Sequence, residues 1–260
     1  MSVGPQELEG RVALVTGGGR GMGRAAAIAL AEAGARVMAV SRTAEELATL
    51  AEHPGITTFS VSLATPQGCQ AAVDETHRRL GPVDVLVSNA GTGSAAERPI
   101  WEQDPDVWYG SIAVNLHASF ELIRLTARDM IARRWGRIVV VSSTAGLAAE
   151  GPSDTAYTAG KHGVIGLVRA AALDLAPHGT TCNAVCPGWV RTEMAEASAR
   201  AEAERRQITP DEVWAERAQG YDAGRVVEVA EITGVIRFLA SPQASGISGE
   251  AIRVALGNQF

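Results

Sequence analysis

The sequence lacks the features of secreted, membrane and nucleic-acid-binding proteins. It has three cysteines, an odd and uneven set that forms no disulfide framework and fits a reducing compartment. Its formal net charge of −6 gives no electrostatic reason to bind nucleic acid or an anionic membrane. No apolar run reaches the roughly 18 residues of a membrane span, and the first residues lack the pattern of a signal peptide. We therefore expect a cytoplasmic protein that acts on a small molecule.

Two of the cysteines, Cys182 and Cys186, have a spacing that also occurs in metal sites. They lie in an alternating run typical of a strand, where residues four apart are about 13 Å from each other. That separation is too large for two ligands of one small ion. We predict no metal site and interpret both as buried free thiols.

Short apolar runs alternate with helix-like stretches along the chain. Strands are predicted at 12–15, 37–40, 56–61, 83–87, 137–142 and 181–186. Helices are predicted in the alanine-rich stretch that ends at Gly34 and at 44–51, 66–80, 107–133, 156–176 and 227–240. Strands this apolar are covered on both faces, which requires a parallel sheet between two layers of helices. The pattern predicts an α/β protein with a doubly wound Rossmann fold. We expect a mostly parallel sheet of seven strands, which includes these six.

No repeat or linker divides residues 1–260, so a single domain is expected. The charged stretch from about 189 to 224 interrupts the alternation between a strand and the last helix. An excursion of this length in a compact domain often carries short helices and closes over a ligand. We predict a substrate lid there.

The segment TGGGRGMG at 16–23 joins the first strand to the first helix. Glycines at this point let the backbone approach a pyrophosphate, which the helix N-terminus attracts. A flexible turn without a ligand is the alternative, which the position between strand and helix disfavours. The predicted contacts in this turn are Gly17, Gly19, Arg20, Gly21 and Met22.

The second strand ends in Ser41 and Arg42, without the acidic residue that binds a ribose 2′-hydroxyl. Arg42 can instead hold a 2′-phosphate, assisted by Arg20, because a guanidinium suits phosphate in charge and geometry. The alternative is that Arg42 is a solvated loop arginine. We predict NADP(H) as the cofactor.

Tyr157 and Lys161 are four residues apart at the start of a predicted helix, so both project from one face. Reduction of a ketone needs a proton as well as a hydride, and a free phenol has a pKa near 10. An adjacent ammonium and an oxidised nicotinamide lower that pKa toward the working pH. Tyr157 can then act as the acid in reduction and the base in oxidation.

The alternative for this pair is an exposed helical surface without function. Lys161 is the only lysine, beside 22 arginines and three tyrosines. One lysine falls four residues after a tyrosine by chance with a probability of about one per cent. Lysine is a compact cation that suits ribose hydroxyls and a nearby phenol. Ser142 and Ser143 end the preceding strand, so one hydroxyl can steady the substrate oxygen.

Six motifs together resemble the short-chain dehydrogenase/reductases, from about Leu8 to the C-terminus. They are TGGGRGMG at 16–23, SNAG at 88–91, VNL at 114–116, VSSTAG at 141–146, YTAGK at 157–161 and NAVCPGWVRTEM at 183–194. The resemblance implies that Tyr157 is the acid/base, Lys161 lowers its pKa, Ser143 orients the carbonyl and Asn115 supports a proton relay. Thr144 remains an alternative to Ser143.

The resemblance also implies the rest of the cofactor site and the assembly. The implied cofactor contacts are Ser62, Leu63, Asn89, Ala90, Gly91, Tyr157, Lys161, Pro187, Gly188, Val190 and Thr192. Two departures stand out: Ser62 replaces a common aspartate, and Ala255-Leu256-Gly257 replaces an acidic-Gly-Gly run. A homotetramer is implied, with helices near 107–133 and 156–176 buried between subunits.

We expect a ketone and secondary alcohol as substrates, in a pocket that includes Ala95, Leu147, Ala148 and Trp189. Reduction of a carrier-bound 3-oxoacyl or polyketide chain is the alternative, since the chain is similar to those reductases. Arg133, Arg134 and Arg137 are candidates for docking an acidic carrier, although a basic turn before a strand is more often a solvated face. A third hypothesis is a non-catalytic nucleotide sensor.

Overall fold

The computed structural model describes residues 6–93, 98–149 and 154–257. Within these ranges, one sheet of seven parallel strands runs in the order β3-β2-β1-β4-β5-β6-β7. The strands are β1 (Val12–Thr16), β2 (Arg36–Ser41), β3 (Ile56–Ser60), β4 (Val85–Ser88), β5 (Gly136–Val141), β6 (Thr180–Pro187) and β7 (Ala251–Val254). The predicted doubly wound Rossmann fold is confirmed, and its order reverses between β1 and β4.

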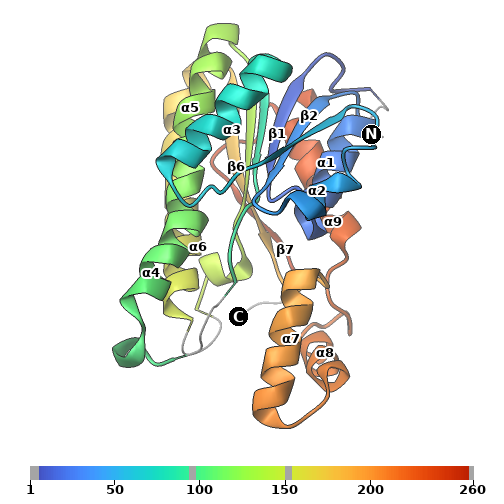
Figure 1. Ribbon diagram of the computed structural model, residues 1–260, viewed down its shortest axis with the longest axis vertical. Coiled ribbons are helices and arrows are strands. Elements are labelled where there is room, and N and C mark those ends of the chain that lie inside the picture. Colours follow the sequence, from blue (N-terminus) through green and yellow to red (C-terminus); the bar gives the residue numbers. More distant parts are fainter. Residues whose placement is uncertain (1–5, 94–97, 150–153, 258–260) are drawn as a thin grey trace.

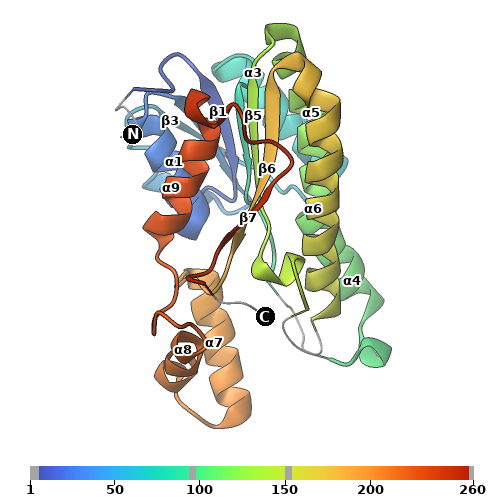
Figure 2. The ribbon, with the colours of Figure 1, turned by 180° about the vertical axis from the view of Figure 1, so that it is seen from behind.

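Helices cover both faces of the sheet (Figures 1 and 2). They are α1 (Gly21–Glu32), α2 (Ala44–Ala48), α3 (Pro66–Arg79), α4 (Pro105–Ile112), α5 (Ala118–Arg133), α6 (Thr155–Leu175), α7 (Glu193–Arg206), α8 (Pro210–Gln219) and α9 (Val229–Ala240). Helices α1 and α9 pack on one face, and α3, α5 and α6 pack on the other. The crevice at the carboxyl ends of the strands is where such folds bind ligands.

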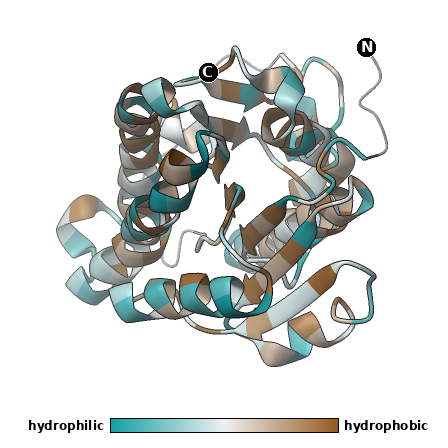
Figure 3. Cartoon of the chain, turned by 90° about the horizontal axis from the view of Figure 1, so that it is seen from above, coloured by the Kyte–Doolittle hydropathy of each residue, from teal (hydrophilic) through white to brown (hydrophobic). Residues whose placement is uncertain are grey.

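The core consists of two apolar layers separated by the sheet. In β1, Ala13 and Val15 face α1 and α9, whereas Leu14 faces the α3, α5 and α6 layer, as the two-residue period of a strand requires. Figure 3 shows the apolar strands enclosed by helices whose polar residues lie mainly outward. No helix in the described ranges is long and apolar enough to cross a membrane.

The stretch predicted as one helix over 107–133 has a wider turn in its middle. Helix α4 passes through a π-helical turn, Ala113–His117, before α5 begins. Such bulges are frequent at functional sites, because they redirect main-chain and side-chain groups. Here the π turn contains Asn115, so the local irregularity coincides with a predicted site residue.

Two short helices, α7 and α8, occupy the excursion predicted at 189–224, and they extend beyond the carboxyl edge of the sheet (Figures 1 and 2). Helix α8 begins with a capping box in which Thr209 and Glu212 satisfy each other's main-chain N–H groups. A separate apolar cluster holds the pair together, with Ala199, Val213 and Trp214 among its buried members. We call residues 189–224 the α7–α8 segment.

Candidate active site

Tyr157 and Lys161 lie on the first turns of α6, at the carboxyl edge of the sheet. The Lys161 side chain is buried and donates a hydrogen bond from Nζ to the main-chain oxygen of Val141, 3.0 Å away at the end of β5. Nζ is 5.6 Å from the centroid of the Tyr157 ring. The structure therefore brings the predicted pair together against the end of a central strand.

Burial gives the lysine an unusual acidity. It lowers the pKa of Lys161 to about 8. Cys186 is buried as well, and burial raises the pKa of its thiol to about 11. At neutral pH the site therefore holds one ammonium group beside a neutral thiol.

Three consecutive hydroxyl side chains follow β5, and each has a different partner. Ser142 donates to the main-chain oxygen of Lys161 at 2.9 Å, and Thr144 donates to the main-chain oxygen of Pro187 at 3.2 Å. Ser143 is half-buried, and its Oγ accepts a hydrogen bond from the main-chain N–H of Ala145. This contact leaves the hydroxyl proton of Ser143 free to be donated to a substrate oxygen.

Asn115 is buried in the π turn, and both the oxygen and the nitrogen of its side-chain amide form hydrogen bonds. Its Oδ1 accepts from the main-chain N–H of Thr92 at 3.2 Å, and its Nδ2 lies 3.1 Å from the hydroxyls of Thr92 and Ser111. A Cβ atom at Gly91 would lie 2.9 Å from Asn115 Oδ1 and 3.4 Å from Lys161 Nζ. Gly91 thus lies at the junction of Asn115 and Lys161, which supports its assignment to this site.

The glycine turn has the close packing that a phosphate cradle requires. Gly17 and Gly21 have φ values of +64° and +52°, which favour glycine. A Cβ atom at Gly23 would collide with the main-chain oxygen of Gly17. Asn89 donates from Nδ2 to the Thr16 main-chain oxygen at 3.0 Å, which ties the turn to the end of β4. These residues fit a dinucleotide cofactor, whose pyrophosphate would face the N-terminus of α1.

Glu46, in α2, is a member of this region that the sequence analysis missed. It accepts a hydrogen bond from Ser41 Oγ at 3.0 Å and lies 3.5 Å from Arg20 Nε. Arg42, predicted to hold a phosphate, is exposed, and its guanidinium has no ion pair among the described residues. No local pattern marks Glu46, because its contacts depend on how α2 packs against the glycine turn.

The segment after β6 returns over the N-terminus of α1. Thr192 caps α7, and its Cβ would be 3.4 Å from a Cβ placed on Gly21. Gly188 has no room for a side chain, because a Cβ there would collide with the hydroxyl of Tyr221. Tyr221 also accepts a hydrogen bond from the main-chain N–H of Trp189 at 2.6 Å. Sequence reasoning missed Tyr221, which lies more than 30 positions away from its partners.

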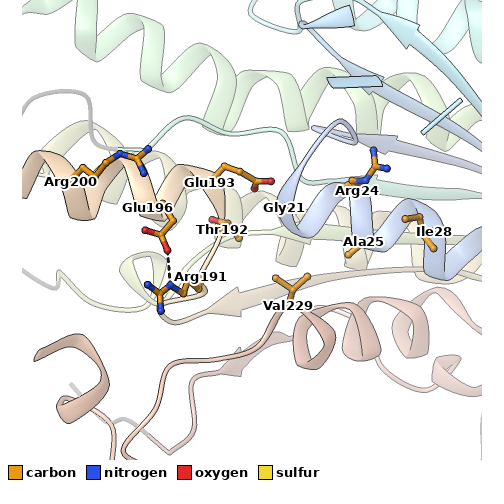
Figure 4. A pocket seen from close by; sticks show the side chains of 10 residues that line it. All are labelled: Gly21, Arg24, Ala25, Ile28, Arg191, Thr192, Glu193, Glu196, Arg200 and Val229. Atoms are coloured by element: carbon orange, nitrogen blue, oxygen red, sulfur yellow. Dashed lines mark hydrogen bonds and ion pairs between the residues drawn. The ribbon is translucent and has the colours of Figure 1, made fainter. Parts of the chain in front are cut away.

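An open cavity of about 650 Å³ lies between the start of α1 and the α7–α8 segment (Figure 4). Gly21, Thr192 and Glu193 line it next to the glycine turn, and Glu193 points toward Gly21. Arg191 is paired with Glu196 at 2.6 Å on its wall. The cavity is therefore continuous with the predicted pyrophosphate position and is bordered by charged groups.

Several other predicted residues are placed as follows. Ser62 is exposed after β3, whereas the Leu63 side chain is buried in the core, so a cofactor contact at Leu63 would come from its main chain. Leu147 and Ala148 are half-buried just after Ser143, and Trp189 is 37% exposed. Ala95 lies outside the described residues. Met22, Ala90, Pro187 and Val190 lie where the glycine turn, β4 and β6 end.

The prediction that Arg137 helps to dock a carrier is wrong. Its side chain is buried, stacks 4.7 Å from the Trp135 ring and donates to the main-chain oxygens of Ser241 and Gly136. Arg133 lies 3.4 Å from the buried Asp84 carboxylate. These contacts stabilise the amino ends of the strands, and of the three arginines Arg133 and Arg134 are the exposed ones.

The residues that depart from the family pattern near the C-terminus pack close to Gly188. Ala255 is buried, and its Cβ lies 3.2 Å from the position of a Cβ on Gly188. Leu256 follows with a φ of +50°, a conformation that costs a non-glycine residue about 1 kcal/mol.

The three cysteines are free and buried, as predicted for Cys182 and Cys186. No group of three or more metal-ligating side chains converges in the described parts of the chain.

Comparison with known proteins defines the class of protein. The family described as short chain dehydrogenase matches residues 11–203, so the chain belongs to this family of oxidoreductases. An acetoacetyl-CoA reductase from Shinella zoogloeoides is 36% identical over 252 residues, which cover 96% of this chain and 98% of the relative.

Two solved structures share nearly the whole fold. Levodione reductase has a TM-score of 0.90 at 29% identity, covering 96% of this chain and 98% of that one. A variant of actinorhodin polyketide ketoreductase with NADPH also has a TM-score of 0.90, at 32% identity and 98% coverage of both chains. The chain is thus an enzyme similar to reductases that interconvert carbonyl and alcohol groups.

Proposed function

We propose that the protein is an NADP(H)-dependent oxidoreductase that interconverts a ketone and a secondary alcohol. The observation that carries this proposal is the position of Lys161 Nζ, 5.6 Å from the centroid of the Tyr157 ring. Gly91 lies next to both Lys161 and Asn115, and Ser143 follows the end of β5. The similarity to a polyketide ketoreductase with NADPH supports the choice of cofactor. Arg20 and Arg42 supply positive charge at the end of β2, where a 2′-phosphate would bind.

The bound nicotinamide supplies the hydride. Ser143 donates a hydrogen bond to the substrate oxygen and so fixes its position, while it keeps its own proton. Tyr157 delivers a proton to the same oxygen as the alcohol forms, and takes it back in oxidation. Lys161 holds a positive charge near the phenol ring, which favours the phenolate that remains after proton transfer. Asn115 keeps the π turn in place through Thr92 and Ser111.

A 3-oxoacyl thioester is the second candidate substrate. The 36% identity to an acetoacetyl-CoA reductase over nearly the full chain favours it. A long acyl chain would enter between the α7–α8 segment and the half-buried Leu147 and Ala148, so that this segment acts as a lid. A non-catalytic sensor is disfavoured, since it would not require the tyrosine, serine and lysine together.

We further propose a cytoplasmic homotetramer. Large apolar side chains are exposed on the helices expected between subunits: Tyr109 on α4, Phe120 and Ile131 on α5, and Leu173 on α6. Their fractional exposures reach 69% for Tyr109 and 78% for Leu173. Burial of this surface in a partner would remove it from water. Multi-angle light scattering at micromolar concentration tests the assembly.

The decisive test of the proposed function is the Tyr157→Phe variant. Wild-type protein should oxidise NADPH with acetoacetyl-CoA or with free ketones and diketones, as followed by nicotinamide absorbance. The variant should lose at least about 100-fold in kcat, because it removes the proton donor, while its Kd for NADPH stays within twofold. The exposed Tyr109→Phe change is the control. Undiminished turnover in the Tyr157 variant would refute this role, and full biological effect without turnover would favour a sensor.

A further inference from the structure

A carboxylate occupies the part of the crevice that suits a phosphate. Glu46 accepts a hydrogen bond from Ser41 Oγ at 3.0 Å, and its other carboxylate oxygen is 3.5 Å from Arg20 Nε. Ser41 ends β2 and Arg20 belongs to the glycine turn, so these two donors lie where the 2′-position of an adenosine ribose binds in such folds. The acidic group is therefore held by the same donors that a 2′-phosphate would use.

Close packing fixes Glu46 in this position. A Cβ atom at Gly19 would lie 2.7 Å from Glu46 Cβ and 2.9 Å from Oε2, so the side chain rests directly on the glycine turn. The Glu46 side chain is 26% exposed. Its neighbour Glu45 is exposed and has no ion pair within the described residues. The contact is thus specific to one of two adjacent carboxylates.

The two cofactors respond to this carboxylate in opposite ways. A 2′-phosphate carries roughly two negative charges at neutral pH, so it competes with Glu46 for Arg20 and is repelled by it. A 2′-hydroxyl can donate a hydrogen bond to the carboxylate, as acidic residues in this region do for NAD(H). Arg42 attracts the phosphate but does not neutralise Glu46, since it has no ion pair in the part of the chain described.

We propose that Glu46 is a specificity-determining residue, which competes with the 2′-phosphate for Arg20 and Ser41 and so limits the preference for NADP(H) over NAD(H). The carboxylate must move aside for NADP(H) and can stay for NAD(H). This inference rests on the proposed function only in requiring that the glycine turn bind a nicotinamide dinucleotide.

The test is calorimetric titration of NADP⁺ and NAD⁺ into wild type, Glu46→Gln and the matched control Glu45→Gln. The Gln side chain keeps the shape of Glu46 and removes its charge. We expect the Kd for NADP⁺ to fall about tenfold in Glu46→Gln and the Kd for NAD⁺ to stay the same or rise. Glu45→Gln should keep both values within twofold of wild type.

A fragment titration isolates the subsite. Adenosine 2′-monophosphate should bind Glu46→Gln more tightly than wild type, whereas adenosine 5′-monophosphate should bind both equally. Glu46→Ala, titrated with the same two nucleotides, is a second variant that removes the carboxylate, so the result does not depend on the correct folding of one variant alone. The inference is wrong if the ratio of the Kd for NADP⁺ to the Kd for NAD⁺ in Glu46→Gln is within twofold of the same ratio in Glu45→Gln. It is also wrong if Glu46→Gln binds NADP⁺ more weakly than wild type does. If wild type binds neither dinucleotide, the proposed function itself fails.

Discussion

The side-chain ammonium of Lys161 donates a hydrogen bond to the main-chain oxygen of Val141 at 3.0 Å, in a buried position at the end of β5. The chain contains no other lysine. Burial lowers the pKa of this group from 10.5 to about 8, so holding the charge costs folding free energy. Lys161, which the proposed chemistry requires, therefore lowers the free energy of unfolding of the protein.

Lys161→Met should therefore raise stability while it abolishes turnover. Below pH 8 both the folded and the unfolded chain carry the proton, and the folded state bears the full cost. Between pH 8 and 10.5 the unfolded chain still binds the proton and the folded chain does not. The free energy of unfolding of the wild-type protein therefore rises with pH over this range. A pKa shift of this size means that the buried charge destabilises the folded state by roughly 3 kcal/mol. The Met variant removes this cost but also loses the hydrogen bond to Val141, which reduces the gain by about 1 to 2 kcal/mol.

The measurement is urea unfolding of cofactor-free protein at pH 7 and pH 10. The gain in the free energy of unfolding should be about 1 to 2 kcal/mol at pH 7 and smaller or absent at pH 10. Arg169→Met on the exposed face of α6 is the control, and its effect should not change with pH over this range. An equal gain from Lys161→Met at both pH values would contradict the assigned cost of burial.

Ser143 and Thr144 can be separated by paired substitutions. Ser143→Ala should lower kcat about 100-fold or more, because it removes a donor aimed at the substrate oxygen, with the Kd for NADPH unchanged. Thr144→Val should lower the free energy of unfolding by about 1 kcal/mol through loss of the bond to Pro187, and change kcat only a few-fold. Steady-state kinetics and urea unfolding of both variants check this. The reverse pattern would assign the substrate contact to Thr144.

The sequence was sufficient to predict the succession of β1 to β6 and of the main helices, because local periodicity indicates each of them, whereas β7 was not located. Apolar runs such as Val12–Thr16 alternate with helical patterns, and the parallel sheet follows from runs that are covered on both faces. The proximity of Tyr157 and Lys161 could likewise be predicted from their spacing, since both lie on one helix.

Contacts between distant loops could not be predicted in this way. Glu46 meets Arg20 only because α2 packs on the glycine turn, and Tyr221 meets Trp189 only because the α7–α8 segment folds back on β6. The π turn at Asn115 was not predicted, and the hydrogen bonds of Asn115 reach Thr92, 23 positions earlier in the chain. The role predicted for Arg137 was wrong because its charge is satisfied by main-chain oxygens inside the fold.

Arg217 should control the order of the α7–α8 segment. It is buried between two tryptophans, 3.6 Å from the Trp189 ring centroid and 4.9 Å from that of Trp214, and it lies 2.9 Å from Glu202. Replacement by Met removes both cation–π contacts and a partly buried ion pair, which together stabilise by about 2 kcal/mol. Because Trp189 borders the proposed pocket, the loss should raise KM for the carbonyl substrate more than it lowers kcat.

Arg206→Met is the matched control for this prediction, since Arg206 also pairs with Glu202, at 2.8 Å, but contacts neither tryptophan ring in the described structure. Its ion pairs are exposed, so solvent screens them and they should contribute little to stability. Hydrogen exchange followed by mass spectrometry should show faster exchange across residues 193–219 in Arg217→Met, and little change in the rest of the chain. Equal exchange in the two variants would mean that the apolar cluster alone orders the segment, and that the contacts of Arg217 do not contribute to its stability.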